Sequence, residues 1–314
     1  MRFYTKEEID GVLNYPSLIE ALKGAFIGDS IVPPRHHHDF KNPKEGIDST
    51  LLLMPAWKES ESLGVKVVTV SPNNAKYDMP SIQGIYLLFN AQNGKLDALL
   101  DGKALTAKRT AASSALGSSF LSRKDSSSLL MIGTGALSIE LIRAHASVRP
   151  IKDVFVWGRD INKAKKIANE LKNEFNIIAV ETILEVISKV DIISCATLSK
   201  TALVLGENLV EGQHIDLVGA YKPDMREAND ALIKKVDIFI DTPMALKETG
   251  DLKIPLEQGT INKNDIQADL FDLSRKKHLG RNNNKQITLF KSVGHALEDL
   301  AAAILVKEKL IDKN

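Results

Sequence analysis

A glycine-rich turn between an apolar run and a helix-forming segment is the first place in this sequence where residue types predict chemistry. The turn reads GTGALS at 133–138 and follows the apolar run at 128–133. In a dinucleotide-binding turn, Gly133 would permit the tight turn, Gly135 would let the backbone approach a pyrophosphate, and the helix N-terminus would donate N–H groups. Ser138 replaces the third glycine with another small residue. Because a second strand ends about 20 residues further on, we predict a dinucleotide site; the alternative is an ordinary turn with two glycines.

The residues at the end of that second strand indicate which dinucleotide would bind. NAD-specific enzymes place an acid there for the ribose 2′-hydroxyl, but here Gly158 takes this position and Arg159 follows. Without the carboxylate, a 2′-phosphate meets no repulsion, and a guanidinium can pair with it through two bonds. We therefore predict NADP(H) as the preferred cofactor. The neighbouring Asp160 keeps NAD(H) open, and Arg159 read as a solvated loop charge is the alternative.

The segments around the turn predict the sheet that must position it. Apolar runs at 128–133, 153–158, 176–180, 190–197, 214–220 and 236–241 predict strands, and helices are predicted near 136–147, 161–174 and 182–189. Continuous apolar strands that alternate with helices are typical of a doubly wound parallel sheet.

The first third of the chain predicts a different architecture. Short apolar runs at 49–57, 63–72, 82–90 and 95–102 predict a mostly antiparallel sheet, with a tight hairpin at Asn93-Gly94. One helix is predicted over 9–28, with Thr5 and Glu8 as a capping box. Further helices are predicted over 106–121 and from 294 to about 310, and we expect the last one to return to this first part.

Composition excludes several classes of protein. With 314 residues, two domains are expected, and 41 Lys+Arg against 40 Asp+Glu argues against a nucleic-acid binder. No apolar stretch is long enough for a membrane helix, and the N-terminus lacks the apolar core of a signal peptide. The single cysteine, Cys195, lies in an apolar run and is interpreted as a core residue. We expect a soluble cytoplasmic enzyme that binds neither nucleic acid nor membrane.

Several longer motifs carry a resemblance to a known family. They are LLLMPAW, LGVKVVTVSPNN, LDGKALTAKRTAASSAL, MIGTGALS, DIISCATLS, LVGAYKPDMRE and ITLFKSVGHALEDLAAA, in this order. Over about residues 30–306 the chain resembles the ornithine cyclodeaminase/mu-crystallin family. The resemblance implies an α/β protein in which a Rossmann-type doubly wound sheet, residues 121–293, is inserted into an α+β substrate-binding and dimerisation domain, residues 1–120 plus 294–314. It also implies a homodimer that moves hydride between a nicotinamide cofactor and a Cα–N bond.

The resemblance assigns three cations to a substrate carboxylate: Arg35, Lys66 and Arg109. Three cations would fix the carboxylate and hold Cα in a defined orientation. Lys66 matches a position often given an acid–base role, and because it lies in an apolar strand its ammonium would need a carboxylate ligand as partner. The alternatives are a helix cap for Arg109 and a surface charge for Arg35. The histidines at 36–38 are interpreted as loop residues with no metal, since adjacent side chains cannot easily share one ion.

Two departures from the cyclodeaminases favour one branch of the family. An acid expected just before Met54-Pro55 is replaced by Leu52 and Leu53, and a catalytic aspartate is replaced by Tyr221. Cyclodeamination must activate an amine and expel ammonia, which requires acid–base groups. Reduction of a preformed cyclic ketimine requires fewer.

We therefore predict NAD(P)H-dependent reduction of Δ1-pyrroline-2-carboxylate, and of Δ1-piperideine-2-carboxylate as a second substrate, to L-proline and L-pipecolate. The alternatives are an ornithine cyclodeaminase, an alanine-type amino-acid dehydrogenase, or a non-catalytic NADP(H)-binding protein. The protonating group is left open between Lys66, Tyr221 and solvent.

The resemblance also implies a set of cofactor-binding residues. They are Gly133, Gly135, Ala136 and Leu137 near the pyrophosphate, Gly158, Arg159 and Asp160 near the ribose, Thr197, Val218, Gly219 and Ala220 near the nicotinamide, and Lys291 and Ser292 from the returning segment. An ion pair of Arg226 with Glu227 is expected to order the loop after Tyr221.

Overall fold

The computed structural model describes residues 2–311, and the chain divides into two compact units. The first unit is Met1–Thr110 with His295–Asn314, and the second, Ala111–Gly294, is inserted between them in the sequence. The division falls inside helix α3 (Gly102–Leu121) rather than at its end, where the sequence placed it. The second half of this helix packs within the second unit, because a Cβ on Gly117 would lie only 2.8 Å from the ring of Phe290.

The first unit is built on one sheet. Its elements are β1 (Arg2–Tyr4), α1 (Lys6–Val12), α2 (Tyr15–Ile27), β2 (His36–Phe40), β3 (Ser49–Lys58), β4 (Ser62–Val70), β5 (Ile82–Asn90), β6 (Leu96–Asp101) and α10 (Ala296–Ile311). Within the described residues the sheet has six strands in the order β1-β6-β5-β4-β3-β2, antiparallel except for β1 with β6. The predicted antiparallel sheet is therefore confirmed.

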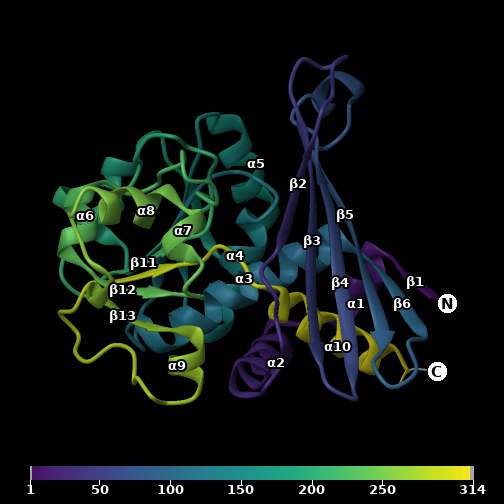
Figure 1. The fold of residues 1–314 in the computed structure, drawn as a ribbon. Helices are drawn as coiled ribbons and strands as arrows, with labels where there is room; N and C mark the ends of the chain where they lie inside the picture. Colours follow the sequence, from purple (N-terminus) through teal and green to yellow (C-terminus); the bar gives the residue numbers. More distant parts are fainter. Residues whose placement is uncertain (1, 312–314) are drawn as a thin grey trace. The chain divides into compact units, whose positions relative to one another are not determined.

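The two faces of this sheet differ in burial. On one face Met54, Ala56, Tyr86 and Leu88 are buried, and α10 lies across β3, β4 and β5 while α2 packs against α10 (Figure 1). The second face carries apolar side chains that are only half-buried, among them Leu51, Leu53, Pro55, Trp57, Leu63, Val65, Val67, Ile85, Leu87, Phe89 and Leu99. They form cross-strand rows, for example Pro55–Val65–Leu87, so this face is apolar without being covered as the first one is.

The helix predicted over 9–28 is wrong as a single element. The chain forms α1 and α2 instead, and Leu13 between them is extended. Asn14 begins α2 by accepting a hydrogen bond from Ser17 N, and Pro16 stands in its first turn, where its missing N–H costs nothing. The capping box of Thr5 and Glu8 is confirmed at the start of α1.

The second unit contains a parallel sheet. Its strands are β7 (Ser128–Ile132), β8 (Asp153–Trp157), β9 (Asn176–Ala179), β10 (Ile192–Cys195), β11 (His214–Leu217), β12 (Asp237–Ile240), β13 (Ile266–Asp269) and β14 (Thr288–Lys291). Its helices are α4 (Ser138–Val148), α5 (Ile161–Leu171), α6 (Asp230–Lys235), α7 (Ala245–Glu248), α8 (Gly250–Glu257) and α9 (Leu270–Ser274).

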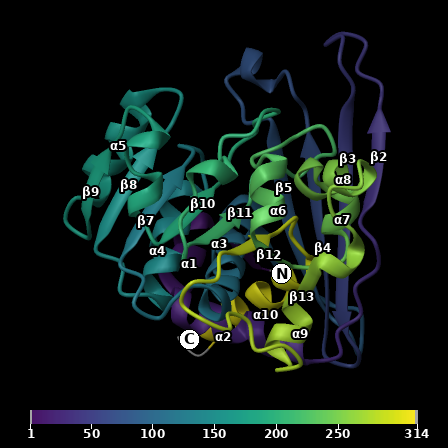
Figure 2. The ribbon, with the colours of Figure 1, turned by 90° about the vertical axis from the view of Figure 1, so that its left-hand side faces the viewer.

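The order of these strands confirms the doubly wound fold. Among residues 2–311 it is β13-β12-β14-β11-β10-β7-β8-β9, and Figure 2 lets the run from β9 to β11 be followed across the sheet. The helix predicted near 182–189 is wrong: two short 3-10 turns, Ile183–Glu185 and Ile187–Lys189, take its place. Strands β13 and β14 were not predicted.

The helices give no sign of a membrane span. In the part of the chain that the structure describes, no helix combines the length and the apolar character that crossing a membrane requires.

Candidate functional site

The glycine-rich turn joins β7 to α4 and presents bare backbone. Gly133 has φ +119°, and a Cβ there would lie 2.5 Å from the carbonyl oxygen of Ala196, so only glycine fits. Ser138 Oγ donates to the carbonyl oxygen of Gly133 at 2.9 Å and ties the turn to the start of α4. A Cβ on Gly135 would meet nothing within 4 Å, so the turn faces open space at this point.

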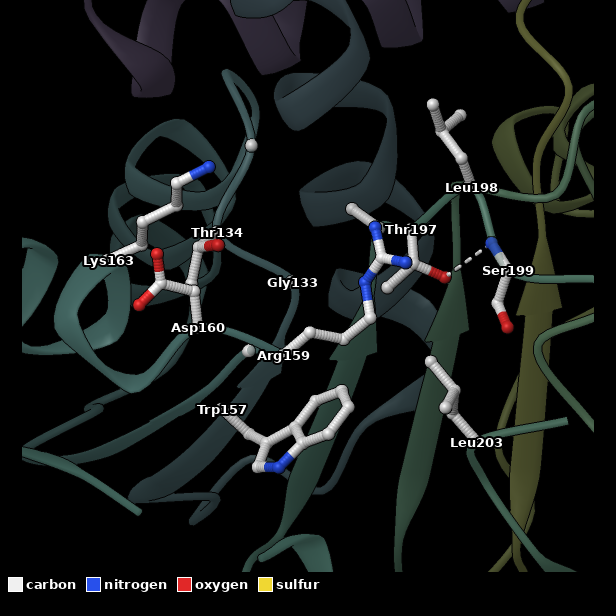
Figure 3. Close-up of a pocket in the computed structure, with 13 residues that line it drawn as sticks. Gly133, Thr134, Trp157, Arg159, Asp160, Lys163, Thr197, Leu198, Ser199 and Leu203 are labelled. Carbon is white, nitrogen blue, oxygen red and sulfur yellow. Dashed lines mark hydrogen bonds between the residues drawn. The ribbon is translucent and has the colours of Figure 1, made fainter. Parts of the chain in front are cut away.

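A cavity of about 560 Å³ lies beside the turn (Figure 3). Its lining residues are Gly133, Thr134, Gly135, Trp157, Gly158, Arg159, Asp160, Lys163, Ala196, Thr197, Leu198, Ser199 and Leu203. They come from the carboxyl ends of β7, β8 and β10, which is where open α/β sheets bind their ligands. The volume is in the range of small-molecule and cofactor pockets.

The end of β8 brings charged side chains to this cavity. Asp160 accepts a hydrogen bond from Asn162 N at 3.0 Å and so caps α5. Arg159 and Lys163 are exposed, and Figure 3 shows Arg159 extending toward Thr197 while Lys163 lies beside Asp160. Two cations therefore line the cavity, and the one carboxylate at the strand end is engaged by the helix.

These features fit a dinucleotide. The turn offers backbone N–H groups at the start of α4, where Leu137 is the N-cap residue and provides no side-chain cap. Six of the predicted cofactor residues line the cavity: Gly133, Gly135, Gly158, Arg159, Asp160 and Thr197. Ala136 and Leu137 lie next to it at the start of α4, outside its lining. Lys163 and Thr134 were missed, although Lys163 stands one helical turn after Arg159 and Thr134 lies inside the glycine motif.

The assignment of Lys291 to the cofactor needs correction. Its side chain is fully buried, with Nζ 3.2 Å from Asp251 Oδ2 and 3.9 Å from Glu227 Oε2. An ammonium between two buried carboxylates supports the strand ends and is not presented to a ligand. Ser292 is buried as well, and its N–H donates to the carbonyl oxygen of Leu217.

The loop after β11 also differs from expectation. Val218 is buried, whereas Gly219 N and Ala220 N both donate to the Glu227 carboxylate. The expected pair of Arg226 with Glu227 is wrong, because the guanidinium of Arg226 bonds Asp230 at 2.6 Å.

Tyr221 follows in the same loop and is half-buried. Burial, and then the charge of Asp224, raise the pKa of its hydroxyl. The phenol therefore keeps its proton at neutral pH.

A second group of charges lies in the first unit, between β4, α3 and α10. Lys66 Nζ is 2.7 Å from Asp299 Oδ2, and Arg109 Nε donates to Asp299 Oδ1 at 3.0 Å. Arg109 Nη1 donates to Glu298 Oε2 at 2.7 Å. Lys66 is only 3% exposed and both carboxylates are 0% exposed. Lys66 therefore has a protein carboxylate as partner, so its burial alone does not demand a ligand.

The acids of this group were missed in the sequence. Glu298 and Asp299 stand within GHALEDLAAA, the motif at the start of α10. The available signal was that these two consecutive acids lie in a helical segment of small and apolar residues, where a charged side chain is expected to be buried and paired.

The surroundings of Lys66 bring the pKa of its ammonium group close to neutral pH. Desolvation, then the charge of Arg109, lower its pKa to about 8, while Asp299 opposes the shift and Arg35 adds to it. Although burial alone would raise the pKa of Asp299, Arg109 and Lys66 lower it. Asp299 is therefore a carboxylate throughout the neutral range, and Lys66 is the member of the group whose pKa lies near neutral pH.

Arg35 and His295 face the same group. Arg35 is half-buried just before β2. Desolvation, and then the charge of Arg35, lower the pKa of His295 to about 4, so this imidazole is uncharged at neutral pH. The field of Arg35 thus reaches both His295 and Lys66, and the three predicted cations act on one site.

The histidines at 36–38 are not in a loop as expected. They form the first part of β2, which pairs with β3 at the edge of the sheet, and all three are exposed. Among the described residues no three His, Cys, Asp or Glu side chains are grouped so that they could hold a metal ion. The absence of a metal stays a prediction.

The sequence and the fold of this chain are both similar to those of known proteins. The sequence model of the ornithine cyclodeaminase/mu-crystallin family matches residues 2–314. The Δ1-pyrroline-2-carboxylate reductase of Colwellia psychrerythraea is 37% identical over 317 residues, which cover 99% of this chain and 100% of that protein. Among solved structures, the Thermococcus litoralis Δ1-pyrroline-2-carboxylate reductase in complex with NADH and L-proline has a TM-score of 0.92 and 33% identity, covering 100% of this chain and 98% of that one.

An archaeal alanine dehydrogenase dimer with bound NAD has a TM-score of 0.91 and 26% identity, over 99% of this chain and 96% of that one. The fold is therefore shared along the whole chain, and the resemblance noted in the motifs is confirmed. The chain belongs to the ornithine cyclodeaminase/mu-crystallin family.

Proposed function

We propose that this protein is an NAD(P)H-dependent Δ1-pyrroline-2-carboxylate reductase that forms L-proline, with Δ1-piperideine-2-carboxylate as a second substrate. The observation that carries the proposal is the charge group of the first unit. Lys66 and Arg109 are buried against the carboxylates of Glu298 and Asp299, and the charge of Arg35 acts on Lys66, so cations converge where a ligand carboxylate would bind. Relatives that cover nearly the whole chain carry this activity in their names, which supports it.

The cations would bind and orient the substrate carboxylate. Arg109 is held through Nε and Nη1 by Asp299 and Glu298, so Nη2 is the nitrogen that it would turn to a ligand. Lys66 is held by the same Asp299. Because their side chains are already fixed, little rotamer freedom is lost on binding, and the carbon next to the carboxylate is held in one orientation.

The reaction needs few protein acids. The protonated C=N of the ring accepts a hydride at C2, the π bond breaks toward nitrogen, and a C–H bond and a secondary amine result. The bound reduced nicotinamide supplies the hydride. No ammonia leaves and no amine must be activated, which agrees with Leu52, Leu53 and Tyr221 in place of the acids of a cyclodeaminase. Lys66, with a pKa of about 8, is a proton donor suited to neutral pH; Tyr221 and solvent are the other donors.

The first test is turnover. Purified protein with NADPH or NADH should consume the reduced cofactor when Δ1-pyrroline-2-carboxylate is added, as followed by absorbance. Lys66→Ala should lower kcat/KM about 100-fold or more, because the carboxylate loses a fixed charge, while cofactor binding persists.

The matched control is Lys95→Ala, which removes an exposed lysine from a turn of the same unit; its rate should equal that of the wild type. Release of ammonia from ornithine with NAD, without oxidation of NAD(P)H by the ketimine, would contradict the proposed reaction.

Binding of a carboxylate should depend on the charge of Lys66. The pKa of Lys66 in the free protein is about 8, and a bound carboxylate raises it. Affinity is therefore full below this pH and is lost above it, by up to about tenfold per pH unit. Pyrrole-2-carboxylate is a suitable probe, because its ring nitrogen does not titrate in this range, and calorimetry with saturating oxidised cofactor measures its Kd.

Two variants separate Lys66 from other groups in this experiment. Lys66→Arg keeps its positive charge at higher pH, so the affinity for the carboxylate should no longer fall as the pH rises. Asp299→Asn removes the carboxylate that raises the pKa of Lys66 and should move the loss to lower pH. A wild-type Kd that stays constant from about pH 7 to about pH 10 would exclude Lys66 from carboxylate binding.

We also propose that NADP(H) is preferred over NAD(H). Arg159 and Lys163 line the cavity, and Asp160 is engaged as the cap of α5. A 2′-phosphate would therefore meet cations, and no carboxylate is offered there to a 2′-hydroxyl. Relatives were solved with NADH or NAD, and the NADP(H) preference is proposed for this chain from its own cavity residues.

Charge reversal at Arg159 tests the preference. Arg159→Glu should lower kcat/KM for NADPH relative to NADH about 100-fold, because a charge-assisted pair becomes a repulsion. Lys165→Glu, on the following helix α5 but outside the cavity lining, should leave the ratio within about twofold. An unchanged ratio in Arg159→Glu would refute the role of Arg159 in 2′-phosphate binding.

We further propose that the protein is a homodimer formed through the second face of the six-stranded sheet. Antiparallel sheets with a solvated face carry polar residues there, whereas this face carries half-buried apolar side chains from Leu53 to Phe89. An alanine dehydrogenase of the same fold was solved as a dimer. A cytoplasmic location remains a prediction.

Light scattering tests the dimer. The wild type should have the mass of two 34.5 kDa chains, and Val65→Asp, at the centre of the face, should give a monomer because a buried charge opposes association. Lys166→Asp, at an exposed position of α5 in the second unit, should remain a dimer. A monomeric wild type would rule out this interface.

A further inference from the structure

We propose that Glu227 is a positioning residue that holds one wall of the cofactor cavity, the segment from Thr197 to Leu203. The inference rests on the proposed function in one respect, that the ligand of this cavity is NAD(P)H. Glu227 itself is fully buried and does not line the cavity, so it would act through the backbone that does.

The carboxylate of Glu227 joins the ends of two neighbouring strands. Thr197, after β10, donates to Oε1 through its backbone N at 2.6 Å and its Oγ1 at 2.9 Å. Gly219 and Ala220, after β11, donate to Oε2 through their backbone N atoms at 2.8 and 3.2 Å. All four groups are donors, so the site requires an acceptor at both oxygens, which an ionised carboxylate provides and an amide does not.

The backbone around Glu227 holds the rest of the wall. Its carbonyl oxygen accepts from Leu203 N and Val204 N, both at 2.9 Å, and Arg226 N donates to the carbonyl oxygen of Ser199 at 3.0 Å. Both ends of the segment are thus tied to the same two residues. Four members of the segment line the cavity: Thr197, Leu198, Ser199 and Leu203.

The ends of β10 and β11 approach so closely that no side chain fits at position 219. A Cβ on Gly219 would lie 2.1 Å from both the nitrogen and the oxygen of Thr197, and 2.5 Å from Glu227 Oε1. The carboxylate therefore sits in a space that only glycine leaves open, with its position fixed by backbone on two sides.

A second layer of charges holds Glu227. Asp251 Oδ1 accepts from Glu227 N at 2.7 Å and from Ala228 N at 3.0 Å. The buried ammonium of Lys291 lies against both carboxylates, and the thiol of Cys195 is buried beside them. Burying such a group of charges is costly. Because it holds Glu227, which in turn holds the cavity wall, we interpret this group as a support of the ligand site.

The test compares cofactor binding with imine binding. Glu227→Gln keeps the size of the side chain but places an NH₂ group against donors. We expect the Kd for NADPH, measured by fluorescence or calorimetry, to rise at least about tenfold. The KM for the ketimine, whose carboxylate binds in the first unit, should stay within about twofold. A merely structural role would instead reduce the active fraction and leave both constants unchanged.

Two further variants make the result decisive. Glu211→Gln changes an exposed residue of the same unit that pairs with Lys285 outside the cavity lining, and it should bind NADPH as the wild type does. If Glu227→Gln does not fold, Glu227→Asp keeps the charge but shortens the reach, and its folded fraction should bind NADPH more weakly than the wild type. A wild-type Kd in whichever of these two Glu227 variants folds overturns the inference, whereas a wild-type protein that does not bind NAD(P)H overturns the proposed function and the inference with it.

Discussion

The carboxylate of Asp299 is the contact on which the buried charge group of the first unit depends. It accepts from Lys66 and Arg109 at once, and without it two buried cations would face each other in a medium that screens poorly. It also sets the reactivity of the group, since it opposes the fall in the pKa of Lys66 that burial causes. In the proposed reductase, one ion pair would both prepare the site for a substrate anion and hold the pKa of Lys66 near 8.

In the second unit buried charges are paired with the signs reversed. There a buried lysine, Lys291, lies between Asp251 and Glu227, and the carboxylate of Glu227 is left to organise backbone N–H groups. In both units the buried charges are paired inside the protein, and the cations at the cavity, Arg159 and Lys163, are exposed. A formal net charge of +1 over the chain conceals this separation.

The sequence predicted what local patterns determine and missed what distant pairing determines. Apolar runs and glycine turns located most of the strands and the cofactor turn, because hydrophobic period and backbone freedom are local properties. Asp299 and Glu227 were not recognised as anchors, since their partners lie in other elements. Lys291 was misassigned for the same reason: a lysine that ends a strand looks identical in sequence whether it faces a ligand or a buried acid. The break between α1 and α2 was marked by Asn14 and Pro16, but the apolar period ran across it.

The close approach of Gly158 to Thr134 constrains how cofactor choice could evolve. An acid that recognises a ribose 2′-hydroxyl would have to stand at position 158, yet a Cβ there would lie 2.6 Å from Thr134 Cγ2. Asp160 offers no substitute, because releasing it would uncap α5. An acid at position 158 would therefore require the side chain of Thr134 to turn away or to be replaced, so the residues at 134 and 158 constrain each other.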